Sequence, residues 1–306
     1  MAVLIDPARW PAHGTRFAHL ASDHSLAELH GFANDNAVPF RAFDHDHYDI
    51  PASRIDELVA AGAIPVEARE LVRRVTEAGL RVRGTDRQPR RDQAVRRLAQ
   101  SWSRLLPDQA ETGRRLLERW QEGHRHYHDV RHLAHVLDAL DVLADGSPSL
   151  PVSLAAWFHD AVYTGVAGVD ERASADLAVV ELGAIGLPSS LVSEVKRLIL
   201  LTISHQPWDG DLAGAQLIDA DLAILGQVPG RYQLYLRGIR LEHPNLSDQQ
   251  FGLARAAVVR ALLVTEKLFS TPSGQRLWLN QARHNLADEL LRWQAVMGPD
   301  HLSERP

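Results

Sequence analysis

A histidine and an aspartate stand side by side in AAWFHDAVY, residues 155–163, which is otherwise an apolar stretch. Adjacent side chains on a helix point about 100° apart, so His159 and Asp160 can converge only on a small object close to the helix surface. A metal ion is small enough for this. For the dipeptide alone, a simpler interpretation is a helix end at which His159 is a hydrogen-bonded core histidine and Asp160 is a cap.

Three histidines in HRHYHDVRHLAHVLDAL have helical spacing. His128, His132 and His135 are separated by four and three residues, so a single helix would bring all three to one face. An apolar stripe that starts at Leu133 would run beside them. Such a face is unusual for an ordinary core helix, and it indicates a site that binds a ligand.

Two carboxylates stand among leucines and isoleucines in LIDADLAILG. Burying Asp219 or Asp221 there is costly unless the charge is paired or bound to a cation. A cation accounts for them most simply. His132 precedes His159 by 27 residues, and Asp221 follows Asp160 by 61.

The order of a histidine, a His-Asp pair and a distant aspartate resembles the HD superfamily of metal-dependent phosphohydrolases. The likeness is carried by YHDVRHLAHVL, AAWFHDAVY, ERASADLA, LLTISHQ and DADLAILG, and it covers about residues 98–295. The subgroup that these blocks resemble is described as predicted metal-dependent HD phosphohydrolases. The resemblance implies an all-helical bundle that holds a divalent metal between its helices, with the ligands His132, His159, Asp160 and Asp221.

The ligand set agrees with the chemistry that this resemblance implies. Two imidazoles and two carboxylates suit Mn²⁺, Fe²⁺, Co²⁺, Ni²⁺ or Zn²⁺, with Mg²⁺ as a further candidate, and they leave positions free for water and a phosphate oxygen. A metal lowers the pKa of a bound water towards 7 and makes it a nucleophile. The expected activity is hydrolysis of a phosphate ester, with a nucleotide or related phosphorylated metabolite as the small-molecule substrate. No sequence motif indicates which base, sugar or chain length the substrate would have.

Further residues of the same blocks are candidates for catalysis. Glu171 could orient the attacking water or carry its proton, Arg172 could hold phosphate oxygens, and His205 could protonate the leaving oxygen. A glutamate at a helix N-terminus and a histidine at a helix C-terminus are also common for structural reasons. Side chains expected to contact the ligands or the substrate are His128, Asp219 and Tyr163.

Two other functions remain open. A di-iron oxygenase can be built on an HD scaffold when extra histidines bind a second iron, and His128, His135 and His205 are available for this. The alternative from another class is a ligand-sensing or nucleic-acid-associated binding module. Salt-sensitive binding of nucleic acid by residues 1–104 would favour that module.

The N-terminal segment predicts a small α/β domain. AVLID is typical of a short buried strand, SDHSLAELHGFA of a helix capped by Ser22 or Asp23, and residues 51–82 of two short helices followed by a strand at Leu80–Val82. WPAHGTRFAHLASDHSLAELHGFA, DHYDIP and VEARELVRRVTEAGLRV resemble a compact bacterial family, domain of unknown function 4031, over about residues 1–83. This resemblance implies a domain boundary and brings no established chemistry.

Five polar residues match the pattern of that family, and they define a second candidate site for a metal or a phosphate. They are His13, His19, Asp23, His47 and Asp49. Turn and capping chemistry around a small core is the structural alternative for all five.

The chain therefore reads as a multidomain protein, with a small α/β domain at 1–83, a basic linker at 84–97 and an all-α HD-type helical bundle at 98–306. Eight arginines and two acids lie between Arg81 and Arg104. A basic run this short is usually a solvated surface. The leucine-rich segment between Phe251 and Leu291 could supply the face of a homodimer or close the core.

Composition narrows the classes of function. The 306 residues carry a formal net charge of −6, which argues against broad binding to nucleic acid or to an anionic membrane. With no cysteine, the chain has no disulfide, thiolate zinc site or cysteine nucleophile. The N-terminus lacks a signal-peptide pattern, and no apolar run reaches the roughly 20 residues of a membrane span. A cytoplasmic location is expected.

Overall fold

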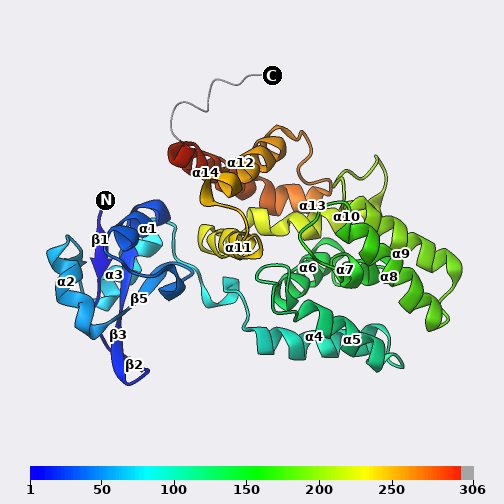
Figure 1. The fold of residues 1–306 in the computed structure, drawn as a ribbon, viewed down its shortest axis with the longest axis horizontal. Coiled ribbons are helices and arrows are strands. Elements are labelled where there is room, and N and C mark those ends of the chain that lie inside the picture. Colours follow the sequence, from blue (N-terminus) through cyan, green and yellow to red (C-terminus); the bar gives the residue numbers. More distant parts are fainter. Residues whose placement is uncertain (298–306) are drawn as a thin grey trace. The chain divides into compact units, whose positions relative to one another are not determined.

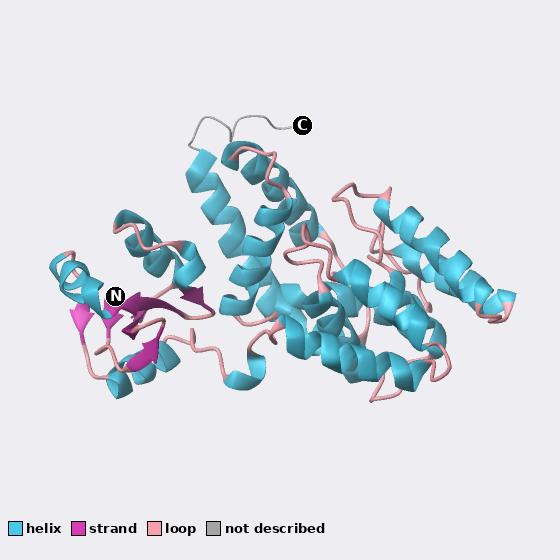
Figure 2. Ribbon diagram, turned by 60° about the horizontal axis from the view of Figure 1, so that its bottom comes forward, coloured by secondary structure: helices cyan, strands magenta, loops and turns pink. Residues whose placement is uncertain are grey.

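The computed structural model describes residues 1–297, and its contacts divide the chain into two units. The N-terminal unit comprises residues 1–87 with 228–234, and the helical unit comprises 88–227 with the chain from Tyr235 onward. The strands lie in the first unit, and the described part of the second is built of helices (Figure 1, Figure 2). The prediction of a small α/β region followed by a helical region is confirmed. The predicted bundle ran to residue 306, and residues 298–306 lie outside the described ones.

The N-terminal unit is built on a mixed sheet in the order β4-β5-β3-β1-β6, with β2 paired to β3. β1 and β6 are parallel, and the other pairs are antiparallel. His13 and Gly14 form the turn between β2 and β3 with φ of 47° and 76°, the left-handed values that a tight hairpin requires. The strands are β1 (Val3–Ile5), β2 (Trp10–Ala12), β3 (Thr15–Ser22), β4 (Phe43–Asp44), β5 (His47–Pro51) and β6 (Ile64–Pro65).

Helices α1 (Leu26–Asp35), α2 (Ile55–Ala60) and α3 (Ala68–Glu77) complete this unit, together with the short helices η1 (Phe40–Ala42), η2 (Ala52–Arg54) and η3 (Gly84–Asp86). The predicted helix cap was wrong in its position. Ser22 ends β3, and it is the Ser25 side chain that accepts from the backbone N–H of Glu28. The strand predicted at Leu80–Val82 is also wrong, because the Val82 N–H donates to the buried carboxylate of Asp46 at 2.6 Å instead of to a neighbouring strand.

The helical unit contains ten whole α-helices among the described residues and the part of α11 that begins at Tyr235, and no described helix is long and apolar enough to cross a membrane. The first of them, α4, begins at Arg91, inside the predicted linker. The helices are α4 (Arg91–Leu105), α5 (Ala110–Trp120), α6 (Val130–Leu143), α7 (Leu150–Phe158), α8 (Asp170–Ala184), α9 (Ser189–Leu201), α10 (Leu212–Asp221), η4 (Leu222–Gly226), α11 (Pro229–Glu242), α12 (Asp248–Val264), α13 (Pro272–Gly274), η5 (Gln275–Leu279) and α14 (Asn280–Met297).

Helix α7 is the central element of this unit. Its residues from Val152 to Phe158 are all buried, as expected for a helix that is apolar on every side. It packs against α6, α8, α9 and α10. Trp157 of α7 meets Trp102 of α4 edge to face with ring centroids 5.0 Å apart, and both side chains are buried. The C-terminal end of α7 is thereby held in place, and His159 follows it directly.

Candidate metal centre

Three helices bring the central residues of the site together. His132 lies in the first turn of α6, His159 directly follows α7, and Asp221 is the last residue of α10. Each of these helices packs against the other two. The two histidines are buried and Asp221 is largely buried, so the group lies inside the helical unit and close to a surface opening.

The spacing of the side-chain atoms suits a single ion. His132 Nε2 lies 3.1 Å from His159 Nε2, and Asp221 Oδ1 lies 3.2 Å from the former and 3.6 Å from the latter. Two ligands that bind one cation with bonds of about 2.1 Å at tetrahedral or octahedral angles lie roughly 3.0–3.4 Å apart. The His132, His159 and Asp221 group could therefore hold a metal, since its ligand atoms all lie within 4.8 Å of one another.

Asp160 borders this group from the turn after α7. Its Oδ2 lies 3.3 Å from His159 Nε2 and 3.7 Å from His132 Nε2. Asp160 thus lies beside the two histidines, but it is not among the three residues whose ligand atoms all lie within 4.8 Å of one another, and its role as a ligand stays a prediction.

Hydrogen bonding orients one of the two imidazoles for coordination. His159 Nδ1 donates to the Ala156 carbonyl at 2.8 Å, which leaves Nε2 as the free nitrogen of the neutral ring. His132 also presents Nε2 to the group, while its buried Nδ1 has no hydrogen-bond partner within residues 1–297. Both rings therefore present the same type of nitrogen to one point.

The electrostatics of the group call for a positive charge. Burial lowers the pKa of His132. Burial also opposes protonation of His159, but the carboxylates of Asp160 and Asp221 raise the pKa of this histidine well above its usual value. The histidines in turn lower the pKa of both carboxyls against the effect of burial. A proton on His159 would offset one of the two carboxylate charges, and a bound divalent cation would balance both.

Arg125 stabilises the turn that carries His159 and Asp160, a role that the sequence did not predict. Its side chain is fully buried and donates to the carbonyl groups of His128, Asp160 and Ala161 at 3.0, 2.7 and 3.1 Å. Its guanidinium also lies 5.4 Å from the centre of the Trp120 ring. An arginine in a histidine-rich, charged stretch is typical of a protein surface, so no local sequence pattern identifies Arg125 as a buried residue of the site.

Glu242, at the end of α11, was also missed. Its side chain is fully buried, and it accepts from His128 Nδ1 at 2.8 Å and from the Tyr163 hydroxyl at 3.0 Å. Burial opposes the ionised form, but the His128 side chain and the backbone N–H groups of Tyr127 and His128 lower the pKa of Glu242 to about 2. Glutamate near a helix end is so common on surfaces that the sequence gives no signal for this role.

His128 lies outside the helix in which its spacing placed it. Asp129 caps α6, which starts at Val130, so the prediction that His128, His132 and His135 share one helical face is wrong for the first of them. The ring of His128 is nevertheless 5.5 Å from that of His132 and stacks on Tyr163 at 4.3 Å.

His205 reaches the group from the chain after α9. Its Nε2 lies 3.2 Å from Asp221 Oδ2, and its backbone has a φ of 53°, a left-handed value that is uncommon for a histidine. Backbone strain of this kind is frequent at functional sites.

Glu171 and Arg172 differ in their surroundings. Glu171 accepts from the Gly168 N–H at 2.6 Å and lines a cavity together with Asp160 and Asp221. Arg172 is exposed and its guanidinium donates to the Gly168 carbonyl. The structure thus brings the glutamate to the group and orients the arginine along its own loop.

Asp219, two residues before Asp221, makes its hydrogen bonds outside the candidate metal group. Its carboxylate accepts from the backbone N–H groups of Ser270 and Thr271, both at 2.7 Å, and from the Thr271 hydroxyl at 2.6 Å. These bonds tie α10 to the loop before α13, which explains why an aspartate is buried there.

Two cavities meet at this group. One, of about 370 Å³, is walled mainly by apolar residues of η4, α11 and α12, and the other, of about 250 Å³, is polar and reaches the N-terminus of α8. His128, His205 and Asp221 line both. Asp221 is therefore accessible from both cavities and Asp160 from the smaller one, whereas His132 and His159 line neither.

The candidate residues of the N-terminal unit separate into two sets. His19, His47 and Asp49 form the second of the two groups within residues 1–297 that could hold a metal. His13 lies in the β2–β3 turn, and Asp23 pairs with Arg74 and accepts from the Ala2 N–H. The structure does not bring these two residues into the group.

Residues 3–78 match the family model described as protein of unknown function (DUF4031), and this confirms the resemblance predicted for the start of the chain. No curated protein and no solved structure matches the chain. The likeness of the later residues to the HD superfamily stays a prediction. The chain thus contains a DUF4031 domain, followed by a helical region with a candidate metal centre.

Proposed function

We propose that the helical unit is a metal-dependent phosphohydrolase with the ligands His132, His159, Asp160 and Asp221. The observation that carries the proposal is the buried group of His132, His159 and Asp221, with ligand atoms within 4.8 Å of one another. The class of reaction comes from the resemblance of the ordered motifs to HD phosphohydrolases. A bound divalent cation would supply Lewis-acid activation of water and neutralise charge on a phosphoryl group.

The two cavities support a substrate with one apolar and one charged part. The larger cavity has walls of the kind that receive an organic group, including Leu222, Tyr235 and Ile239, and Lys267 lies at its edge. The smaller cavity is lined mainly by polar side chains, among them Tyr163, Thr202 and His243. A nucleotide or a similar phosphorylated metabolite would place its phosphate where the two cavities meet.

Residues of this chain would position water and protons around that phosphate. Glu171 lines the smaller cavity and is our candidate for orienting the attacking water. His205 borders both cavities and is our candidate for donating a proton to the leaving oxygen. Lys267 would draw the phosphate towards the larger cavity, although Asp209 now pairs with it at 3.0 Å.

Metal content and phosphate release test the proposal together. The untagged chain is loaded with Mn²⁺ or Co²⁺, its metal content is measured, and phosphate release is followed over nucleoside monophosphates, cyclic dinucleotides and sugar phosphates. We expect metal-dependent turnover in the wild type. We also expect His132→Ala and Asp221→Ala to lose about one metal per chain and at least 10²-fold in kcat.

His284→Gln is the matched control, because this histidine is exposed on α14. It should keep both metal and turnover. Unchanged metal content in His132→Ala, Asp160→Ala and Asp221→Ala would disprove the metal centre. If the ligand variants lose metal as expected but the metal-loaded wild type hydrolyses no phosphate ester, the metal centre is supported and the phosphohydrolase activity is disproved. Loss of two metals on substitution of His132 would favour the di-iron alternative.

A further inference from the structure

A second set of histidines and carboxylates shares one face of the N-terminal sheet. His19 on β3 lies directly opposite Asp49 on β5, and His47 precedes Asp49 by two residues on the same strand. Side chains two apart on a strand point to the same face, and so do directly paired residues. Asp6 follows β1, and its N–H donates to the His19 carbonyl at 3.1 Å. Three adjacent strands thus place four polar side chains next to one another.

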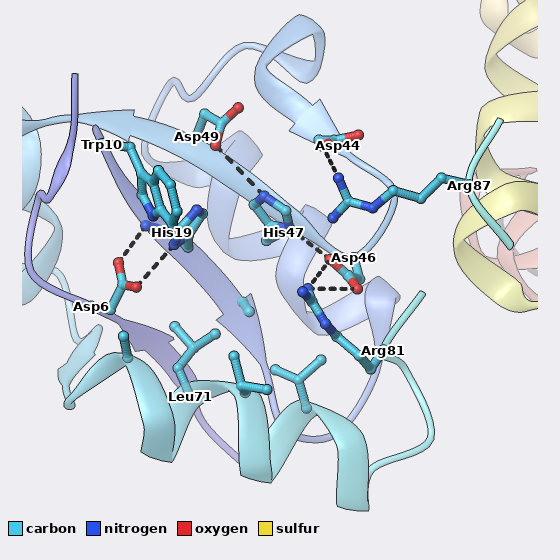
Figure 3. A pocket seen from close by; sticks show the side chains of 14 residues that line it. Asp6, Trp10, His19, Asp44, Asp46, His47, Asp49, Leu71, Arg81 and Arg87 are labelled. Carbon is cyan, nitrogen blue, oxygen red and sulfur yellow. Dashed lines mark hydrogen bonds and ion pairs between the residues drawn. The ribbon is translucent and has the colours of Figure 1, made fainter. Parts of the chain in front are cut away.

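Each histidine of this set is held by a carboxylate. His19 Nδ1 donates to Asp6 Oδ2 at 2.9 Å, and His47 Nδ1 donates to Asp46 Oδ1 at 2.6 Å (Figure 3). Both carboxylates are buried, with 4% and 1% exposure for Asp6 and Asp46. A carboxylate at Nδ1 fixes the tautomer and leaves Nε2 as a basic nitrogen, which is the usual support of a metal-binding histidine.

The carboxylate partners are themselves fixed. Asp46 accepts from the Val82 N–H at 2.6 Å and from Arg81 at 3.1 Å, while Asp6 Oδ1 accepts from the His19 backbone N–H at 2.6 Å. A chance contact on a surface would not use both oxygens of two buried carboxylates. The two histidine rings are therefore rigidly oriented.

The two histidines and Asp49 converge on a common position. One ligand atom from each of His19, His47 and Asp49 lies within 4.8 Å of the others. The rings of the two histidines meet edge to face with centroids 4.8 Å apart, and His47 Nε2 lies 3.6 Å from Asp49 Oδ1. His47 is only 7% exposed. Figure 3 shows the two rings side by side above α3, each with its carboxylate partner on the outer side.

The charge around this position favours a cation over a phosphate. The cavity has a volume of about 370 Å³, and its lining includes four carboxylates and two arginines, Arg81 and Arg87. Both arginines are already paired with aspartates, Asp46 and Asp44, at 3.1 and 3.0 Å. With neutral histidines the lining carries two negative charges, which a divalent cation would balance.

We propose that the N-terminal unit holds a divalent transition-metal ion through His19 Nε2, His47 Nε2 and a carboxylate oxygen of Asp49. Two imidazoles and one carboxylate on one side of an ion suit Zn²⁺, Mn²⁺, Fe²⁺, Co²⁺ or Ni²⁺, and leave positions open towards the cavity. Asp6 and Asp46 are positioning residues that act through the two rings. The site uses residues of the N-terminal unit alone and does not depend on the function proposed for the helical unit.

The test counts metal in the untagged full-length chain after equilibrium dialysis against Zn²⁺. In the His132→Ala/Asp221→Ala background, in which the helical group is disabled, we expect about one zinc per chain. Adding His19→Gln or His47→Gln should remove it. His13→Gln is the matched control, because His13 lies in a hairpin turn of the same unit and outside the group.

Asp6→Asn separates coordination from folding. An asparagine keeps the acceptor for the His19 backbone N–H, but its amide NH₂ would face Nδ1 and favour the tautomer with the proton on Nε2. We expect a zinc affinity 10- to 100-fold weaker, with circular dichroism unchanged.

The proposal is overturned if the His132→Ala/Asp221→Ala background carries no zinc, or if His19→Gln retains as much as His13→Gln. Absence of zinc in this background would mean that the hydrogen bonds of His19 and His47 to their carboxylates serve the fold alone and not a metal site. Failure of the helical centre gives a different pattern, because the wild type and the His132→Ala/Asp221→Ala background would then bind the same amount.

Discussion

Glu242 shows what a single buried carboxylate can do. Its side chain is fully buried, and it accepts five hydrogen bonds, three from the backbone N–H groups of residues 126–128 and two from His128 Nδ1 and the Tyr163 hydroxyl. All five donors favour the ionised form. The segment that carries His128 into the site is thus anchored to α11 by one charge.

This charge predicts a stability that depends on pH. Folding lowers the pKa of Glu242 from 4.5 to about 2, so the unfolded chain binds the extra proton between these values. The contribution is complete above about pH 4.5 and is lost as the pH falls towards 2, and a shift of this size is worth roughly 3 kcal/mol. Glu242→Gln should therefore lower the free energy of unfolding at pH 6 by a few kcal/mol. It should also reduce the loss between pH 5 and pH 3.

Urea unfolding followed by tryptophan fluorescence measures this in the helical unit. Glu118→Gln is the control, because Glu118 pairs with Arg114 on the solvent-exposed side of α5. A pH dependence in Glu242→Gln as steep as that of the wild type would contradict the assigned role.

At the scale of elements, Gly113 of α5 determines how closely α4 can approach. A Cβ at this position would lie 2.2 Å from Cδ1 of Trp102. The indole cannot easily move, because its Nε1 donates to the Gln109 carbonyl at 2.7 Å and its ring packs on Trp157. The close contact between the two helices therefore needs a residue without a side chain.

Two glycine-to-alanine changes should then have opposite effects. Gly113→Ala is expected to destabilise the helical unit by about 1–3 kcal/mol, because the added methyl group overpacks the core. Gly183→Ala, on the exposed side of α8 with nothing within 4 Å, should stabilise it by about 0.5–1 kcal/mol, because alanine is the better helix former. Urea unfolding of both variants measures the pair. A destabilised Gly183→Ala would show that helix propensity does not control that position.

Hydrophobic periodicity and capping residues made the helices predictable from the sequence. Capping also explains why two predicted helix starts were wrong. The apolar run of α7 and the spacing within α6 gave these helices from sequence alone, whereas Asp129 caps α6 and removes His128 from it. Ser25 replaced the expected cap because β3 runs on to Ser22. Local patterns identify the interior of an element better than its ends, where side-chain hydrogen bonds decide.

The site was predictable only in part, for a related reason. His132, His159 and Asp221 were identified because a family resemblance links their spacing to coordination. Arg125 and Glu242 act through backbone carbonyl and N–H groups that come together only in the folded chain. A sequence does not show which backbone groups will be left without partners, so the residues that satisfy them cannot be read from it.

At the scale of the whole molecule, each unit has its own group of histidines and a carboxylate. The first is formed by two neighbouring strands of a sheet, β3 and β5, and the second by the ends of three helices. The two groups have no ligand in common, so a cation bound at one should stabilise mainly the unit that contains it. Metal-linked stability can therefore be assigned unit by unit.

Tryptophan fluorescence makes this assignment measurable. Of the seven tryptophans, six are in the helical unit and only Trp10 is in the N-terminal unit, so fluorescence-detected unfolding follows the helices. A cation at 100 times its dissociation constant stabilises the folded state by about 2.7 kcal/mol. Removing metal with a chelator should therefore lower the urea midpoint of the wild type, and adding Mn²⁺ should restore it. His19→Gln should keep this response and His132→Ala should lose it, because only the second variant removes a proposed ligand from the unit that is observed. Equal responses in the two variants would mean that the cation stabilising the helices is bound somewhere other than at His132.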